Sequence, residues 1–363
     1  MRINHNAYNN LRIPSGERTF ADAFNDGGYR TSYVGKWHLG GTGNDPVPEY
    51  NRGGFTDFIG YENYNDFIDG VLFFDENGDY TPTNDHRTKK TTDIAMERLA
   101  GLVDEQFAMV VSYVNPHYPE QPTLKYEKMY ENLMPTRRPN CTTDPNFDPY
   151  TPISAGTHTV TDGRDDYRYD LDQYLRQYYA MITQLDANLG RLFAELKRLG
   201  LWDSTVIIFT ADHGDMQGSH GLKNKTVHWE ESTRVPFIVR APGGVKGQVL
   251  DYLVSAGIDP FPTCLGFAGL PQEPTTEGNN IAPLVMGERQ LDAVPVFSEL
   301  GGWAMIREGD FKLTVSKSDW QPDYLFDLAN DPYEMTNLVN NSGYSSIESD
   351  LLAKLIEWRD RVA

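Results

Sequence analysis

Apolar positions along the chain follow helical spacing in some stretches and strand-like runs in others. The clearest helical pattern covers Leu171–Leu199, where leucine and tyrosine recur at a spacing of three, four or seven and form one apolar stripe. Apolar runs of strand length occur at Phe107–Val114 and Thr205–Ala211. The second is rich in β-branched residues, as is typical of a buried parallel strand. This alternation predicts an α/β fold with helices on both faces of a sheet.

The remaining segments before residue 292 complete the pattern. Further strands and helices are expected at Tyr29–Val34, Val235–Val239, Glu17–Asn25, Thr92–Val103 and Ile258–Ala268. Residues 41–90 and 118–165 are rich in Gly, Pro, Asn and Asp, which predicts two long loops. We therefore expect a large mixed, mostly parallel sheet flanked by helices.

The pattern changes from about residue 292 onward. A terminal helix is expected near Ser346–Val362, and the short strand patterns before it lie at Pro295–Ser298, Ala304–Ile306, Lys312–Val315 and Tyr324–Asp327. We expect a main α/β domain at 1–291 and a small C-terminal α+β subdomain at 292–363.

Charge and composition narrow the function classes. The 363 residues carry a formal net charge of −20, which argues against a general binder of nucleic acid or of anionic membranes. A local basic pocket still permits an anionic substrate. Hydrophobic residues make up 39%, enough for a sizeable core, and no apolar run is long enough to span a membrane. The first residues contain no apolar segment typical of a signal peptide.

Chemically active side chains follow three of the predicted strands. Ligands of parallel sheets bind at the carboxyl ends of strands, so these positions are candidates for a site. Lys36 and His38 lie in a glycine-bracketed stretch, Gly35–Gly40, directly after the first strand. The alternative is an ordinary loop with a surface lysine, in which Trp37 fills the core.

The other two strand ends carry a histidine and an Asp–His pair. His117 lies between two prolines, a stiff setting that suits a general acid, although a lone histidine is more often structural. Asp212 and His213 are adjacent at the end of a predicted buried strand and are candidate metal ligands. The alternative is a capping aspartate. Lys225 follows shortly after this pair.

Together these side chains suit a doubly charged tetrahedral anion. Lysine acts as a point-charge donor to the oxygens of such an anion, a metal polarises its central atom, and a histidine protonates the leaving oxygen. The candidate reaction is therefore hydrolysis of a sulfate or phosphate ester.

Two motifs resemble the sulfatase family of the alkaline-phosphatase-like superfamily. The stretch Gly35-Lys36-Trp37-His38-Leu39-Gly40 is similar to the family's second signature. Thr210-Ala211-Asp212-His213-Gly214-Asp215, with the following His220-Gly221-Leu222, Lys225 and Glu230-Glu231-Ser232, resembles its later metal-and-lysine block. The segment from Tyr324 to Leu338 is similar as well, so the resemblance covers essentially the whole chain.

The resemblance implies a role for each candidate residue. By analogy, Lys225 would hold the sulfate, His117 would protonate the leaving alcohol, and Lys36 and His38 would support the nucleophile. In the family that nucleophile is a formylglycine hydrate made from a Cys or Ser. The resemblance also implies that Asp212 and His213 bind a divalent cation, usually calcium.

The chain departs from the family at its nucleophile. The family places a C-x-P-S-R or C-x-A-x-R stretch before the second signature and a metal-binding Asp pair still earlier, and neither is present in this sequence. Cys141 and Cys264 lie outside such a motif, and we expect them to be two buried thiols, with one long-range disulfide as the alternative. We therefore expect a sulfatase that lacks its N-terminal catalytic segment, with an incomplete calcium site and little activity alone.

Two other functions stay open at this point. One is a non-catalytic protein that binds sulfated glycans through Lys36, His117 and Lys225, and the other is a phosphodiesterase or phosphonate hydrolase of the same superfamily. We expect a carbohydrate sulfate rather than a simple aryl sulfate as substrate. The predicted loops carry aromatic side chains that could stack on sugar rings or simply pack: Tyr50, Tyr61, Tyr64, Phe67 and Tyr118. Family habit implies a periplasmic or extracellular location.

Overall fold

The computed structural model describes residues 12–14, 16–41, 43, 45–62, 66–68, 71–75, 77–141, 171–222 and 224–362. Contacts among them divide the chain into two compact units. We call one the five-strand unit, made of the described residues of Ile3–Met134 and Asp172–Thr205. The other, the four-strand unit, contains those of Pro135–Leu171 and Val206–Ala363. The boundary that we predict between residues 291 and 292 stays a prediction.

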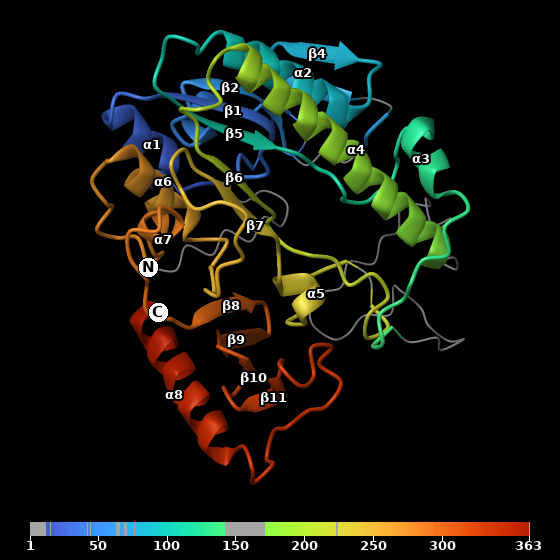
Figure 1. Cartoon of the computed structure of the whole chain (residues 1–363), viewed down its shortest axis with the longest axis vertical. Helices are drawn as coiled ribbons and strands as arrows, with labels where there is room; N and C mark the ends of the chain where they lie inside the picture. Colours follow the sequence, from blue (N-terminus) through green and yellow to red (C-terminus); the bar gives the residue numbers. More distant parts are fainter. Residues whose placement is uncertain are drawn as a thin grey trace. The chain divides into compact units, whose positions relative to one another are not determined.

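The five-strand unit is built on one mixed sheet, visible in Figure 1. Its strand order is β4-β3-β2-β1-β5. The strands are β1 (Arg30–Lys36), β2 (Asp57–Tyr61), β3 (Val71–Phe74), β4 (Tyr80–Thr83) and β5 (Phe107–Ser112). Strand β1 pairs in parallel with both β2 and β5, whereas β3 pairs antiparallel with β2 and β4. The parallel strands β1 and β5 confirm the elements expected there.

The helices of this unit agree with the apolar periodicity. They are α1 (Phe20–Asp26), α2 (Arg87–Ala100), α3 (Leu124–Tyr130) and α4 (Leu171–Arg198), with a short 3₁₀ turn at Glu49–Asn51. Helix α1 begins after Thr19, whose hydroxyl accepts from the Asp22 amide in a capping box. The apolar stripe predicted for α4 is buried at Leu175, Leu185 and Leu192.

Two expected loops contain regular structure. Strands β2, β3 and β4 lie within residues 41–90, and helix α3 lies within residues 118–165. The prediction for residues 41–90 was wrong because the strands are only four or five residues long and the sequence between them is rich in Gly, Asn and Asp. Short strands of this kind gain their stability from pairing with a neighbouring strand, which local composition does not reveal. Residues 142–165 of the second predicted loop lie outside the described residues.

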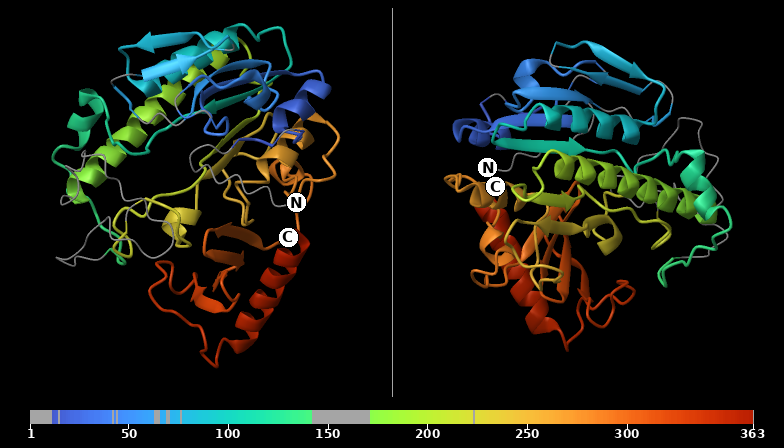
Figure 2. Two further views of the ribbon diagram at one scale, coloured as in Figure 1. Left: turned by 180° about the vertical axis from the view of Figure 1, so that it is seen from behind. Right: turned by 45° about the horizontal axis from the view of Figure 1, so that its top comes forward.

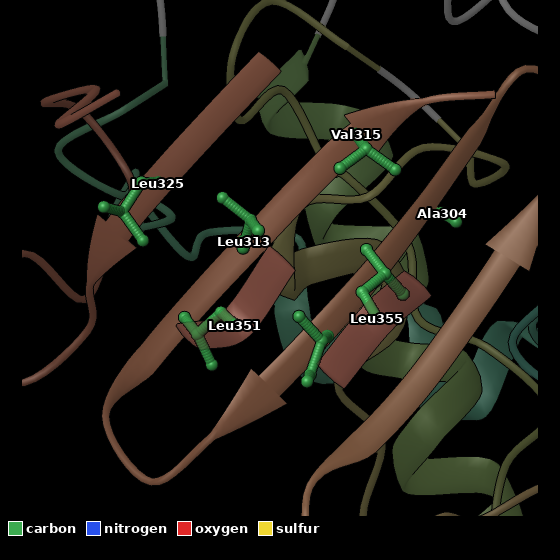
Figure 3. Packing of buried hydrophobic residues seen from close by; sticks show 7 residues of the cluster. Ala304, Leu313, Val315, Leu325, Leu351 and Leu355 are labelled. Carbon is green, nitrogen blue, oxygen red and sulfur yellow. The ribbon is translucent and has the colours of Figure 1, made fainter. Parts of the chain in front are cut away.

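The four-strand unit contains an antiparallel sheet in the order β11-β10-β9-β8. The strands are β8 (Val296–Leu300), β9 (Trp303–Glu308), β10 (Phe311–Ser316) and β11 (Pro322–Asp327). Figure 2 shows helix α8 (Ser345–Val362) running along this sheet. Figure 3 shows Leu351 and Leu355 of α8 against Leu313 and Val315 of β10, and all four side chains are buried. The expected C-terminal sheet and terminal helix are thereby confirmed.

A second, two-stranded sheet in this unit differs from expectation. Strands β6 (Ile207–Thr210) and β7 (Phe237–Arg240) pair antiparallel, and β6 is half-buried. The run Thr205–Ala211 was expected to be a buried parallel strand, but continuous apolar character reports burial preference and not strand direction. The unit's short helices are α5 (Glu230–Thr233), α6 (Pro260–Ala268) and α7 (Ala282–Val285).

The fold class predicted from the sequence is confirmed as mixed α/β with a C-terminal sheet subdomain. Cys141 and Cys264 are both free thiols and are half-buried. Among the described helices, none combines the length and the apolar character needed to cross a membrane.

Candidate functional site

The carboxyl edge of β1 and β5 carries the first group of candidate residues. The two strands are parallel neighbours with Gly35 opposite Ser112, so Lys36 and the loop after β5 lie at the same edge of the sheet. Gly35 has a φ of 117°, and a Cβ there would lie 2.0 Å from the Ser112 carbonyl oxygen. Only glycine fits this close approach.

Trp37 anchors the backbone between Lys36 and His38. Its indole is buried, packs edge-on against Tyr33 and donates a hydrogen bond from Nε1 to the Asn51 carbonyl, 2.9 Å away. The Tyr33 hydroxyl donates to the Lys36 carbonyl oxygen. His38 follows with a φ of 57°, a left-handed conformation that is uncommon outside glycine. Trp37 thus fills the core, as the alternative interpretation proposed, while fixing the backbone of Lys36 and His38 at the sheet edge.

The loop after β5 fixes the ring of His117. Its Nδ1 lies 2.5 Å from the Tyr118 carbonyl oxygen, and its backbone amide donates to Val114 at 2.8 Å. Because a carbonyl only accepts, Nδ1 carries the proton in this hydrogen bond. Proton exchange with a ligand then falls to Nε2. The peptide bonds Asn115-Pro116 and Tyr118-Pro119 are both cis.

Asp212 and His213 follow β6 in the four-strand unit and contact each other. His213 Nε2 lies 3.4 Å from Asp212 Oδ2, and the His213 amide donates to Asp212 Oδ1 at 3.0 Å. The Asp212 side chain is 85% exposed. Calcium takes six to eight oxygen ligands, so this pair supplies only part of its coordination shell. The assignment of Asp212 and His213 as metal ligands therefore stays a prediction.

The segment around Lys225 has an unusual backbone. Asn224 and Thr226 both have positive φ values, 68° and 79°, on either side of the lysine. The Met216 amide donates to the Asn224 carbonyl at 2.7 Å, and Trp303 Nε1 donates to the Thr226 carbonyl at 3.0 Å. The structure thus brings Lys36, His38 and His117 to one edge of the five-strand unit and places Asp212, His213 and Lys225 in loops of the four-strand unit.

A buried polar network lies in the four-strand unit near the Lys225 segment. Ligand-type atoms of His220, Glu231 and Glu334 all lie within 4.8 Å of one another. The Asn140 amide nitrogen lies 3.1 Å from His220 Nε2 and donates to Glu231 Oε1 at 2.9 Å. Lys312 Nζ lies 2.8 Å from Glu334 Oε1.

These donors decide how the network is best interpreted. The Asn140 amide donates to Glu231 Oε1 and the Lys312 ammonium pairs with Glu334 Oε1, so each carboxylate already has one positively polarised partner, although Glu231 Oε2 is buried without a hydrogen bond to any described residue. A divalent ion would also sit beside the buried positive charge of Lys312, which opposes binding. We therefore interpret the network as structural and assign no metal to it.

Burial shifts the pKa values of this network. Desolvation lowers the pKa of His220, with Lys312 as a smaller cause, and the imidazole stacks on Trp229 at a centroid distance of 3.9 Å. Desolvation, reinforced by Lys312, lowers the pKa of His228 to about 3. Burial raises the pKa of Glu334 against the opposing effect of Lys312. The two histidines are consequently neutral at pH 7.

The motifs that resemble the family include His220, Glu231 and Glu334 but assign them no role. No sequence pattern singles out Asn140. Their partners are far apart along the chain, as Asn140 and Glu231 show, so spacing could not reveal the network. The sequence contains one signal that could have pointed to the network: acidic residues are concentrated beside a histidine after a predicted strand.

Comparison with known proteins supports the motif-based interpretation. The family model described as "Sulfatase" matches residues 1–270, and that described as "N-sulphoglucosamine sulphohydrolase, C-terminal" matches residues 218–361. An ulvan-active sulfatase of Formosa agariphila is 28% identical over 96% of this chain and 66% of its own length. An N-acetylglucosamine-6-O-sulfatase of Bacteroides thetaiotaomicron is 30% identical over 51% of this chain and 35% of its own length.

Solved structures give the same result for the fold. The protein yidJ of Bacteroides fragilis superposes with a TM-score of 0.82 at 25% identity, covering 97% of this chain and 78% of the other. A phosphonate monoester hydrolase of Silicibacter pomeroyi superposes with a TM-score of 0.75 at 21% identity, covering 98% and 82%. The second similarity shows the fold alone. The chain spans just under two thirds of the length of the Formosa relative.

Proposed function

This chain belongs to the sulfatase family, and from that premise we propose that its substrate is a sulfate ester of a carbohydrate. The observation that carries the proposal is the family match over residues 1–270, which includes every candidate site residue. The names of two relatives, an ulvan-active sulfatase and an N-acetylglucosamine-6-O-sulfatase, support a sulfated sugar over a simple aryl sulfate.

In this proposal the two lysines bind the anion. Lys36 and Lys225 neutralise sulfate oxygens as point charges, which ammonium groups do without demanding a planar geometry. His38, two residues after Lys36, would support a nucleophile, which no formylglycine motif in these 363 residues supplies. His117 donates the proton that the leaving alcohol oxygen needs, through Nε2, while the Nδ1 hydrogen bond to Tyr118 keeps the ring in one orientation.

Asp212 and His213 are the residues of this chain that would hold a divalent cation. A bound cation would withdraw electron density from the sulfate and so favour attack at sulfur. In the proposal Asp212 contributes carboxylate oxygens and His213 an imidazole nitrogen, and further oxygen ligands are required to complete a calcium shell.

These 363 residues differ from an ordinary sulfatase because they contain no motif for the nucleophile. Burial raises the pKa of the Cys264 thiol to about 12, so this sulfur is protonated at neutral pH and unreactive. Cys141 pairs through its backbone with Ser219 and lies outside any formylglycine motif. We therefore propose that these 363 residues alone bind sulfate esters and turn them over slowly.

A second candidate is hydrolysis of a phosphonate or phosphate ester by the same residues. The superposition on a phosphonate monoester hydrolase favours it, because the fold accommodates that chemistry. The two candidates differ in the central atom of the substrate and share the tetrahedral oxygens that the lysines would bind.

Hydrolysis of 4-nitrophenyl sulfate and of 4-nitrophenyl phenylphosphonate, each with added calcium, tests this proposal. An intact sulfatase relative serves as the positive control. We expect turnover of the sulfate at less than about a thousandth of the control rate, because the covalent route lacks its attacking group. A rate equal to the control would contradict slow turnover, and faster hydrolysis of the phosphonate would favour the second candidate.

Binding distinguishes a slow enzyme from a protein with another substrate. Calorimetric titration with N-acetylglucosamine 6-sulfate should give saturable binding, and unsulfated N-acetylglucosamine should bind at least about tenfold more weakly, since the charged contacts are lost. Equal affinities for the two sugars would contradict the proposed recognition of sulfate.

A further inference from the structure

The backbone beside Lys225 is strained. Thr226 is β-branched and has a φ of 79°, a conformation that its branched side chain disfavours. Asn224, on the other side of the lysine, is also left-handed at 68°. Such conformations persist only where the surrounding structure holds them in place, and they gather at functional sites. The question is therefore which groups hold this segment.

Trp303, the first residue of β9, contacts the strained residue directly. Its Nε1 donates to the Thr226 carbonyl at 3.0 Å, and its side chain is buried. A buried indole nitrogen needs an acceptor, and the Thr226 carbonyl supplies it. The hydrogen bond therefore links the C-terminal sheet to the residue after Lys225.

The helix that follows the segment is held from the same sheet and from the loop after β11. Helix α5 begins at Glu230, and the preceding residue, Trp229, provides no side-chain cap. Instead Glu334 Oε2 accepts from the Glu230 amide at 2.7 Å, which satisfies an otherwise unpaired donor of the helix start. The Glu230 carboxylate is paired with Arg307 of β9 at 2.7 Å.

Lys312 connects both carboxylates at the centre of the sheet. It lies on β10, its side chain is 0% exposed, and its Nζ is 3.2 Å from Glu230 Oε1 and 2.8 Å from Glu334 Oε1. A buried ammonium is stable only when paired in this way. Removing one member of the cluster would leave the others as uncompensated buried charges.

We propose that the C-terminal sheet and the loop after β11 position Lys225, acting through Trp303 on the strained backbone and through Arg307, Lys312 and Glu334 on helix α5. These are positioning residues, because Trp303 contacts the Lys225 segment and the other three contact Glu230 at the start of α5. The inference rests on the proposed function only in giving Lys225 a sulfate to bind.

Hydrogen exchange of backbone amides tests the positioning itself. The variant Trp303→Phe keeps an aromatic ring and removes the donor to Thr226. We expect exchange in residues 224–229 to rise about fivefold, as for loss of one hydrogen bond, with no change in helix α8 or in the five-strand unit. Trp358→Phe, a matched substitution in α8 where the indole stacks on Phe297, should leave residues 224–229 unchanged.

A second variant keeps the proposal testable if Trp303→Phe fails to fold. Arg307→Met removes the pair with Glu230 from a side chain that is partly exposed, so the sheet should tolerate it. Here the rise in exchange should be centred on residues 229–233. Unchanged exchange in both variants, or an equal rise throughout the four-strand unit, would overturn the proposal.

Binding of inorganic sulfate tests whether the effect reaches the lysine. Trp303→Phe and Lys225→Ala should each weaken sulfate binding, and the double variant should bind no more weakly than Lys225→Ala alone, because both act through the same side chain. Additive losses would overturn the positioning role. If exchange rises as expected while Lys225→Ala leaves sulfate affinity intact, the positioning stands and the sulfate-binding role of Lys225 in the proposed function fails.

Discussion

The carboxyl edge of β1 and β5 and the Lys225 segment place their lysines in different ways. Lys36 is fixed by a parallel strand and by its own neighbours, with Trp37 anchored on Asn51 and Tyr33 bonded to the Lys36 carbonyl. Lys225 lies between two left-handed residues, and one of them, Thr226, accepts a hydrogen bond from Trp303, about eighty residues later in the chain. One arrangement is local, and the other depends on a separate sheet.

This difference has consequences for stability and for function. A locally determined edge should survive changes in distant parts of the chain. A segment held by a buried charge cluster should respond strongly to substitutions that touch no ligand. The predictions below test this contrast, from the largest expected effect to the smallest.

Lys312→Met should be the most damaging single substitution. It leaves Glu334 buried without its cation and Glu230 with Arg307 alone, and breaking a buried pair in this way costs about 4 kcal/mol. Chemical denaturation followed by tryptophan fluorescence measures the loss in the free energy of unfolding. Lys317→Met, which removes a lysine pairing with Glu299 in the same sheet, should cost about 1 kcal/mol or less. Similar losses for the two lysines would contradict the role given to the cluster.

Gly35→Ala should disrupt the edge of β1 and β5 in the five-strand unit. The new Cβ would lie 2.0 Å from the Ser112 carbonyl, so β1 and β5 must separate, at a cost of about 3 kcal/mol. Gly190→Ala provides the control, because this glycine lies inside α4 with open space around its Cβ position. There alanine should stabilise the protein by about 0.5 to 1 kcal/mol. Thermal unfolding of both variants checks the pair, and a neutral Gly35→Ala would contradict the close approach.

His228 should make the four-strand unit sensitive to acid. Burial lowers the pKa of His228 to about 3, whereas an unfolded histidine titrates near 6.5. Between these pH values the unfolded chain binds a proton that the folded chain does not. The free energy of unfolding should therefore rise with pH in this window, by up to about 1.4 kcal/mol per unit.

Urea titrations at pH 4, 5, 6 and 7 measure this dependence in the wild type and in His228→Phe. The phenylalanine keeps a ring against Trp229, and comparison at pH 7 isolates any packing change because the histidine is neutral there. The variant should have a shallower slope below pH 6. An unchanged slope would show that His228 does not titrate as described.

The same contrast explains how much could be predicted from the sequence. The apolar stripe of α4 and the strands β1 and β5 were predictable because their signals are local. Strands β2, β3 and β4 were missed because four- or five-residue strands depend on their partners. The placement of Lys36 and His117 at one sheet edge followed from strand polarity, whereas the contacts of Lys225 with residues of the C-terminal sheet did not follow from any spacing.

The most direct test of the central claim is the affinity for N-acetylglucosamine 6-sulfate of the wild type, Lys225→Ala and Lys317→Ala, measured by calorimetry under one set of conditions. The account predicts that Lys225→Ala weakens binding by about tenfold or more, as expected for loss of a charged hydrogen bond, and that Lys317→Ala binds like the wild type. Equal affinities for the wild type and Lys225→Ala would contradict the claim that this chain recognises sulfate through Lys225.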